Sequence, residues 1–168
     1  MTFRWDEEDV EEFMEQNIAQ IGQLIVVGRQ LDIGCGIIDL LAYDADTQEL
    51  IVVEVKKEII EEAAIGQLLR YMMGVENGLK ELGDAVDLPI TGIRGILAAD
   101  RISKQAALAI QYFQGRVQFC EVGLNVEGYL LMHDINNRQH TYNTEALQTS
   151  ICEAKEMQRI AQPEVSEQ

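Results

Sequence analysis

Residues 33–73 constrain the fold of this chain most, because two apolar runs there lie on either side of a short polar segment. The runs are Ile37–Tyr43 and Leu50–Val55, and the segment between them, Asp44–Glu49, is polar and turn-prone. Runs of this length and composition are typical of β-strands, and the short connection favours an antiparallel hairpin. The sequence therefore predicts two neighbouring strands around which the rest of the chain is organised.

Both predicted strands carry charged residues among their apolar ones. Asp39 interrupts the first run, and Glu54 and Lys56 occur at the end of the second. Because side chains alternate across a strand, Glu54 and Lys56 project from the same face. A carboxylate among Ile, Val and Leu side chains loses its hydration, which is costly unless a cation compensates its charge.

A divalent cation held by Asp39 and Glu54 would supply this compensation. Oxygen ligands suit hard ions such as Mg²⁺ or Mn²⁺. Lys56 would then lie beside the ion, where an ammonium group can orient or deprotonate an attacking water or stabilise charge that develops on phosphorus. The simpler alternative is that Lys56 forms an ion pair with Asp39 or Glu54 at a strand end.

These residues resemble the D…ExK signature of the PD-(D/E)xK nuclease superfamily, with Asp39 followed about fifteen residues later by Glu54–Lys56. In the next predicted helix, Gln67 and Tyr71 reproduce a Q-x3-Y motif found in part of that superfamily. The sequence is most similar to the catalytic domain of NucS-type endonucleases, over roughly residues 9–121. The resemblance implies an α/β fold with a restriction-endonuclease-like core, in which helices flank a mixed β-sheet.

The resemblance also implies an activity, the Mg²⁺- or Mn²⁺-dependent hydrolysis of phosphodiester bonds in DNA. Asp39, Glu54 and the backbone carbonyl of Val55 would bind the metal, and Lys56 would orient the water. The acidic residue contributed by the leading helix of the family falls best on Glu11. That residue would complete the metal or phosphate shell.

Four further residues are candidate contacts to the metal, the phosphate or the substrate. They are Gln67, Tyr71, Arg70 and Arg29. Gln67 and Tyr71 are four residues apart and share one face of the helix, so Tyr71 can also pack into the core with Gln67 as its polar edge. Each arginine has a simpler interpretation as well, an ion pair at the surface.

Periodicity and turn signals predict the remaining elements. In chain order they are a helix from Val10, a strand Leu24–Leu31 with a bulge or a bend at Gly28, a helix Glu58–Gly78, a loop between Val75 and Gly92, a strand Ile93–Ala99, a helix Lys104–Gln114, strands Val117–Val122 and Gly128–Asp134, and a helix from Thr144 to about Ile160. The strand, helix, strand order indicates a parallel pair beside the hairpin, hence a mixed sheet. We expect one domain over residues 1–168, with a core at about 9–121, an extension at 122–160 and a frayed tail at 161–168.

Composition narrows the setting and the chemistry. The chain has no apolar run long enough to span a membrane and no basic-then-apolar leader, so we expect a cytoplasmic protein without membrane contact. Its three cysteines lack C-x-x-C spacing, which argues against a zinc site and a disulfide framework. Cys35 has no histidine partner in the motif stretch, which favours packing over a role as nucleophile.

The net charge of −16 is unusual for a protein that binds nucleic acid. Such proteins generally carry a basic surface, because neutralising phosphates supplies most of their non-specific affinity. Two other functions therefore stay open. One is a catalytically inactive nuclease fold that acts as an interaction module through its acidic surface, and the other is a nuclease subunit that needs a basic partner. A homodimer is also compatible with the sequence.

Overall fold

The computed structural model describes residues 5–124, 127–133 and 144–161. Its contacts divide the chain into two compact units, Met1–Asn137 and Arg138–Gln168. The boundary between the units falls outside the described residues, as does the predicted tail beyond Ala161. No helix in the described part of the chain is long and apolar enough to cross a membrane.

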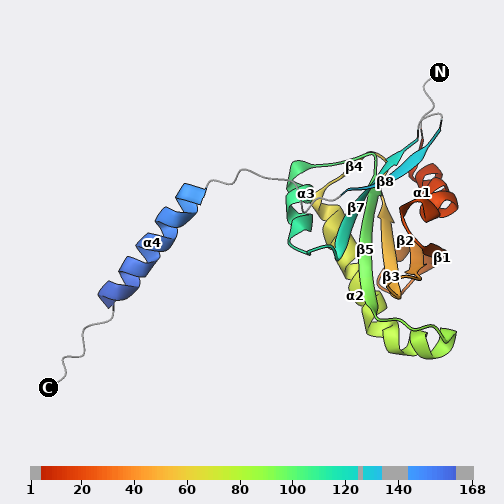
Figure 1. The fold of residues 1–168 in the computed structure, drawn as a ribbon, viewed down its shortest axis with the longest axis horizontal. Coiled ribbons are helices and arrows are strands. Elements are labelled where there is room, and N and C mark those ends of the chain that lie inside the picture. Colours follow the sequence, from red (N-terminus) through yellow and green to blue (C-terminus); the bar gives the residue numbers. More distant parts are fainter. Residues whose placement is uncertain (1–4, 125–126, 134–143, 162–168) are drawn as a thin grey trace. The chain divides into compact units, whose positions relative to one another are not determined.

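A six-stranded sheet with the order β1-β2-β3-β5-β7-β8 forms the centre of the first unit (Figure 1). Its strands are β1 (Leu24–Asp32), β2 (Ile37–Asp44), β3 (Glu49–Val55), β5 (Gly92–Ala99), β7 (Val117–Gly123) and β8 (Tyr129–His133). The pairs β3–β5 and β5–β7 are parallel, and the other three pairs are antiparallel. The predicted fold class, a mixed sheet flanked by helices, is confirmed.

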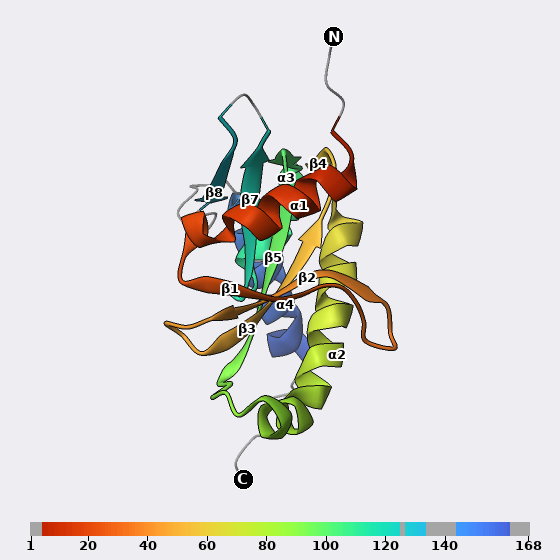
Figure 2. The ribbon, with the colours of Figure 1, turned by 90° about the vertical axis from the view of Figure 1, so that its right-hand side faces the viewer.

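Helices cover both faces of this sheet (Figure 2). One apolar cluster joins the sheet to α2 (Glu62–Val86) and α3 (Lys104–Gln111), and Leu68 is fully buried within it. The other joins the sheet to α1 (Glu7–Asn17) and the 3-10 turn η1 (Ile18–Ile21) that follows it. Burying a large aliphatic side chain contributes about 1.5–3 kcal/mol, so these two clusters hold α1 and α2 firmly against the strands between them.

Helix α1 begins at a capping box. Asp6 accepts a hydrogen bond from the backbone N–H of Asp9 at 3.0 Å, and the Asp9 carboxylate accepts from the Asp6 N–H at 2.8 Å. The two bonds satisfy N–H groups that a helix start leaves without partners. The cap therefore fixes the first turn of the helix that carries Glu11.

The predicted boundaries of the long second helix were wrong at both ends. Helix α2 starts at Glu62 because Ile59–Ile60 form the short strand β4, which pairs in parallel with β6 (Arg101–Ile102). It continues to Val86 through the region predicted as a loop between Val75 and Gly92. A glycine inside a helix costs only about 1 kcal/mol relative to alanine, so the glycines of this region do not end it.

Helix α3 ends at Gln111, three residues before the predicted end. The chain turns at Gln114 and Gly115, whose φ angles are +49° and +88°. Such left-handed angles stop a right-handed helix.

The bulge predicted at Gly28 in β1 is confirmed, because the register between β1 and β2 shifts between Val26 and Gly28.

The second unit contains one described helix, α4 (Thr144–Ala161), close to the predicted bounds. Where their exposure is described, its side chains are exposed. They include three large apolar residues, Ile151, Met157 and Ile160. Nothing within this unit packs against them in the described residues.

Gly36, just before β2, should not tolerate a side chain. Its φ is +151°, and a Cβ built there would lie 2.9 Å from the hydroxyl oxygen of Tyr71 in α2. We expect Gly36→Ala to lower the free energy of unfolding by about 2–3 kcal/mol, because it adds backbone strain and displaces the tyrosine ring. A urea titration followed by circular dichroism measures the loss.

Gly34→Ala is the matched control for this substitution. Gly34 also has a positive φ, +85°, but a Cβ there would meet nothing within 4 Å. This variant should lose only about 1 kcal/mol, from the backbone alone. Equal losses in the two variants would show that the contact with Tyr71 contributes nothing.

Candidate functional site

Asp39 lies where strands β2 and β3 stop pairing. The last paired residues are Leu40 and Val53, and beyond them the Asp39 carboxylate accepts a hydrogen bond from the backbone N–H of Val55 at 2.7 Å. A side-chain oxygen thus replaces the backbone acceptor that a continued ladder would supply. The predicted hairpin therefore places Asp39 beside the end of β3, which carries Glu54.

Lys56 links this strand end to helix α2. Its ammonium group donates to Glu54 Oε1 at 2.8 Å and to Gln67 Oε1 at 3.4 Å. Gln67 Nε2 in turn donates to the hydroxyl of Tyr71 at 2.9 Å. The structure thereby brings together the predicted Glu54, Lys56 and Gln67, and it also contains the ion pair that was the simpler alternative for Lys56.

Glu54 is a carboxylate that the described residues leave half-satisfied. Only 2% of the residue is exposed, and its Oε2 atom has no hydrogen-bond partner among the residues that the structure describes. A buried charged oxygen without a partner is rare and costly. Oxygen atoms of this kind are the ligands that Mg²⁺ and Mn²⁺ prefer, so Glu54 fits the predicted metal site.

The acidic groups here all resist losing their protons. Burial, and then the nearby charge of Glu54, raise the pKa of Asp39 to about 6, against the lowering effect of the Val55 N–H. Burial also raises the pKa of Glu54, although the hydrogen bond from Lys56 opposes it. The pKa of Glu11 is raised by burial and by the charge of Asp39. Charges that repel one another in a partly dry site favour a bound cation.

Lys56 stays protonated in this arrangement. Burial lowers the pKa of its ammonium, but the hydrogen bond and the charge of Glu54 outweigh this effect and leave the pKa raised. The protein without metal therefore holds Lys56 as a charged donor. A protonated Lys56 can orient a water or stabilise negative charge, but it cannot remove a proton from the water.

Glu11 is linked to Asp39 by hydrogen bonds from Gln30, a residue that the sequence analysis did not single out. Gln30 Nε2 donates to the two Glu11 oxygens at 2.9 and 2.8 Å and to Asp39 Oδ1 at 3.3 Å. Its φ is +51°, a conformation that few residues other than glycine adopt. A glutamine in a predicted strand gives no signal of such a backbone.

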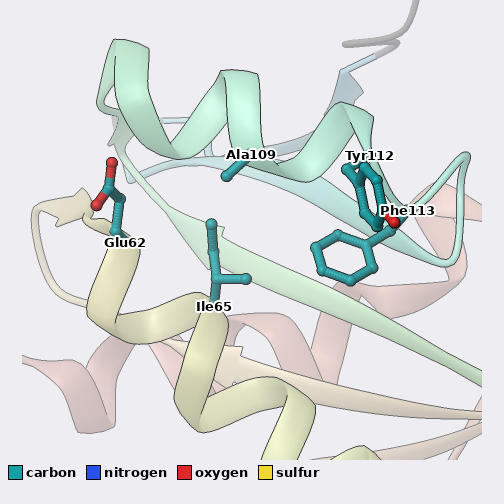
Figure 3. Close-up of a pocket in the computed structure, with 5 residues that line it drawn as sticks. All are labelled: Glu62, Ile65, Ala109, Tyr112 and Phe113. Carbon is teal, nitrogen blue, oxygen red and sulfur yellow. The ribbon is translucent and has the colours of Figure 1, made fainter. Parts of the chain in front are cut away.

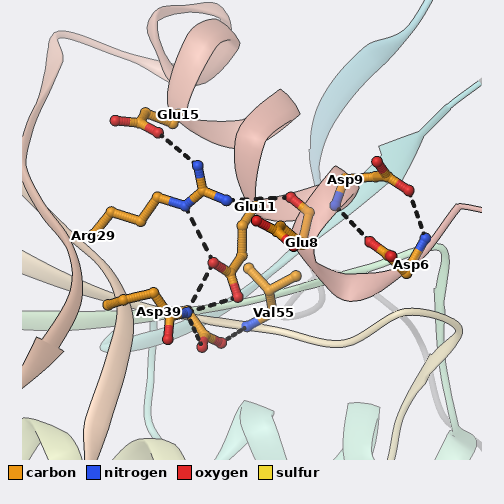
Figure 4. A network of polar contacts seen from close by, with 9 residues as sticks. Asp6, Glu8, Asp9, Glu11, Glu15, Arg29, Asp39 and Val55 are labelled. Carbon is orange, nitrogen blue, oxygen red and sulfur yellow. Dashed lines mark hydrogen bonds and ion pairs between the residues drawn. The ribbon is translucent and has the colours of Figure 1, made fainter.

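Arg29 also contacts the carboxylate of Glu11 (Figure 4). It forms ion pairs with Glu11 and Glu15, each at 3.3 Å, and donates to the backbone carbonyl of Glu8 at 3.4 Å. A cleft of about 410 Å³ opens here, lined by Glu8, Glu11, Arg29 and Gln30. The surface ion pair considered for Arg29 is thus present, and its contact with a substrate stays a prediction.

Arg70 and Tyr71 lie on different sides of helix α2. Tyr71 is 5% exposed and belongs to the core, so its hydroxyl positions Gln67. Arg70 is exposed, lies 5.3 Å from the centre of the Tyr71 ring, and forms no ion pair with any described residue. Its guanidinium therefore remains available to a ligand.

No group of three or more histidine, cysteine, aspartate or glutamate side chains among residues 5–124, 127–133 and 144–161 has a metal-binding arrangement. The predicted site needs only two carboxylates and a backbone carbonyl, because Mg²⁺ keeps several waters. The combination of Asp39, Glu54 and Val55 is therefore compatible with this result.

A second pocket lies between α2 and α3 and has a different character (Figure 3). It has a volume of about 440 Å³, and its lining residues are Glu62, Ile65, Ala109, Tyr112 and Phe113. It shares no residue with the acidic site and contains only one charged group. Its walls offer no pair of ligands for a metal.

Comparisons with known proteins bear on the first unit. Residues 6–123 match the family model for the endonuclease NucS C-terminal domain. No curated protein matches the chain. Three solved structures share its fold, and the chain spans about half the length of each of them.

The first of these structures is a repair endonuclease from Pyrococcus abyssi, with 20% identity, a TM-score of 0.54, and coverage of 72% of this chain and 48% of that one. EndoMS in complex with double-stranded DNA has 24% identity, a TM-score of 0.55, and coverage of 72% and 46%. EndoMS in its apo form has 25% identity, a TM-score of 0.52, and coverage of 74% and 49%. The family model confirms the resemblance to NucS that the motifs predicted, and the three structures show the same fold.

The family model covers well over half of the chain and includes every predicted site residue, from Glu11 to Tyr71. The same span contains the sheet from β1 to β7 and the helices α1 to α3. The chain therefore belongs to the family of the endonuclease NucS C-terminal domain.

Proposed function

We propose that this chain is a Mg²⁺- or Mn²⁺-dependent endonuclease that hydrolyses phosphodiester bonds in DNA. The observation that carries the proposal is the Oε2 atom of the buried Glu54, which has no hydrogen-bond partner in the described part of the chain and interacts with a second carboxylate, that of Asp39, whose pKa is raised to about 6. A protein gains little from placing two such acids together unless a cation joins them. Membership of an endonuclease family supports the same conclusion.

The metal would be held by Asp39, Glu54 and the carbonyl of Val55. When bound, the ion supplies positive charge to the phosphate and to the attacking water. Lys56 would direct its ammonium at that water or at the charge developing on the phosphate oxygens. Gln67 would hold Lys56 in place through the 3.4 Å contact, and Tyr71 would hold Gln67.

DNA as the substrate rests on the family and on one relative. The similar EndoMS structure was determined with double-stranded DNA. Arg70 is the nearby cation most open to a phosphate, since it is exposed and has no described ion pair. Since the net charge is −16, we expect DNA to bind through a few local contacts and the metal rather than through a broad basic surface.

The direct test is cleavage of supercoiled and linear DNA by the purified chain at low salt, with MgCl2, MnCl2 or EDTA. We expect nicking with either metal and none with EDTA. A parallel binding titration at increasing salt should show a shallow dependence, because few phosphates are neutralised. Cleavage that persists in EDTA contradicts the proposal. So does a chain that neither cuts DNA in the presence of Mg²⁺ or Mn²⁺ nor binds either metal.

The same net charge favours a second candidate, a nuclease subunit that cuts only when a basic partner brings the DNA. In that case the isolated chain would bind metal but neither bind nor cut DNA. Metal binding measured without DNA therefore separates this candidate from an inactive interaction module, because the module would bind neither metal nor DNA.

A further inference from the structure

Gln30 has a contact pattern that usually belongs to a cation. One amide nitrogen lies within 3.3 Å of three carboxylate oxygens from two residues, Glu11 and Asp39. Facing only acceptors, the side chain must present its NH2 group, because its carbonyl oxygen would be repelled. The Gln30 amide thus holds together two carboxylates that repel each other, and it does so without adding a charge.

Glu11 and Glu54, the acids on either side of Asp39, differ in how many of their oxygens accept hydrogen bonds. Both oxygens of Glu11 already accept hydrogen bonds, from Gln30 and from Arg29. Glu54 keeps one oxygen without a partner from residues 5–124, 127–133 or 144–161. The protein therefore satisfies the Glu11 end by itself and leaves only the Glu54 end open to an ion.

We propose that Gln30 occupies the position of a second metal ion between Glu11 and Asp39, so that the site binds a single divalent ion, between Asp39 and Glu54. This inference rests on the proposed metal-dependent function and states its stoichiometry. Many phosphate-cleaving enzymes hold two divalent ions, and Mg²⁺ can be bound by one or two carboxylates with waters in its other positions. Here the amide nitrogen of Gln30 lies between the two carboxylates, where such an ion would bind.

The test is Gln30→Glu, which replaces the NH2 donor by a third carboxylate. Glu11 and Asp39 repel this carboxylate, so it should move away from them and bind a second ion as a ligand. Chelator-treated protein is titrated with MnCl2 in a calorimeter, without DNA. We expect one Mn²⁺ per wild-type chain and two per Gln30→Glu chain. Because Gln30 is exposed, the added charge should leave the fold intact, and circular dichroism checks this.

Gln48→Glu is the matched control. Gln48 is also a glutamine with a positive φ, +61°, and it lies at the opposite end of β3, in the hairpin turn. It adds the same charge and should leave the count at one ion. A second ion in this control would mean that net charge, not position, decides the number bound.

Two ions in the wild type, or one in a folded Gln30→Glu variant, overturn the inference and leave the proposed nuclease function standing. No ion in the wild type overturns both. If the variant does not fold, the wild-type count still decides, since two ions there are incompatible with a blocked position.

Discussion

Replacing Lys56 by alanine is expected to reduce metal-dependent DNA cleavage by about 10³-fold. Among the described residues, Lys56 is the cation that pairs with Glu54, and its side chain is 29% exposed, so it can reach both the site and solvent. Asp39→Ala should cause a loss of similar size, because it removes a predicted metal ligand. Initial rates of plasmid nicking at saturating Mg²⁺ measure both effects.

Both variants should remain folded. Without Lys56, Glu54 can take up a proton, so we expect the free energy of unfolding to fall by only about 1–2 kcal/mol. Asp39→Ala leaves the Val55 N–H without its acceptor, at a similar cost. Circular dichroism and thermal melts establish that a loss of activity is a loss of chemistry.

Lys57→Ala is the control for the lysine variant. Lys57 is the next residue, has comparable partial exposure, and forms no ion pair with any described residue. It should retain at least half of the wild-type rate. Wild-type rates in Lys56→Ala and Asp39→Ala together would refute the assigned site, and would point to a contaminating nuclease if EDTA still abolished cleavage.

Glu54→Gln should have opposite effects on metal binding and on stability. It removes the free carboxylate oxygen, so we expect affinity for Mn²⁺ to fall by at least about 100-fold. In EDTA at pH 8 the variant should be more stable than the wild type by about 1 kcal/mol, because a buried charge and its repulsion of Asp39 are gone. Calorimetry and urea unfolding measure the two effects.

The sign of the pH dependence follows from Asp39. Its pKa is about 6 in the folded protein and 3.8 in the unfolded reference, so the folded state binds the proton more tightly. The stability of metal-free protein should therefore fall as the pH rises from about 4 to about 6. After allowance for solvent screening, we expect a fall of about 1–2 kcal/mol. Glu54→Gln should flatten this slope, since the charge of Glu54 contributes to the shift.

Glu58→Gln makes the same chemical change close by and serves as the control. Glu58 is exposed, just beyond the end of β3. Its replacement should alter neither Mn²⁺ affinity nor the pH slope. If Glu54→Gln binds Mn²⁺ like the wild type, Glu54 is not a metal ligand.

The parts of the fold that local periodicity determines were predictable from the sequence. The hairpin of β2 and β3 was predicted within a residue at each end, because two apolar runs joined by a polar turn specify it. Helix α2 was not, because its first predicted turn is a strand that exists only by pairing with β6. Such pairing joins residues about forty positions apart, and no local pattern reports it.

The same distinction applies to the site. Motif spacing was enough to predict Asp39, Glu54, Lys56 and Gln67 as candidate site residues. Gln30 could not be found, because its role depends on a backbone angle of +51° and on the approach of helix α1 to β1. The pairing of Arg29 with Glu11 and Glu15 likewise results from tertiary packing and not from sequence separation.

The contacts of Lys56 also bear on how a scissile bond would be approached. An ammonium group has three hydrogens, and in the described residues two of them are directed at Glu54 and Gln67. Tetrahedral geometry then fixes where the third points, before any nucleic acid arrives. In the proposed reaction, the line along which water attacks would be the same for every strand that reaches the site, and any preference among DNA sequences or structures would have to arise from contacts farther away.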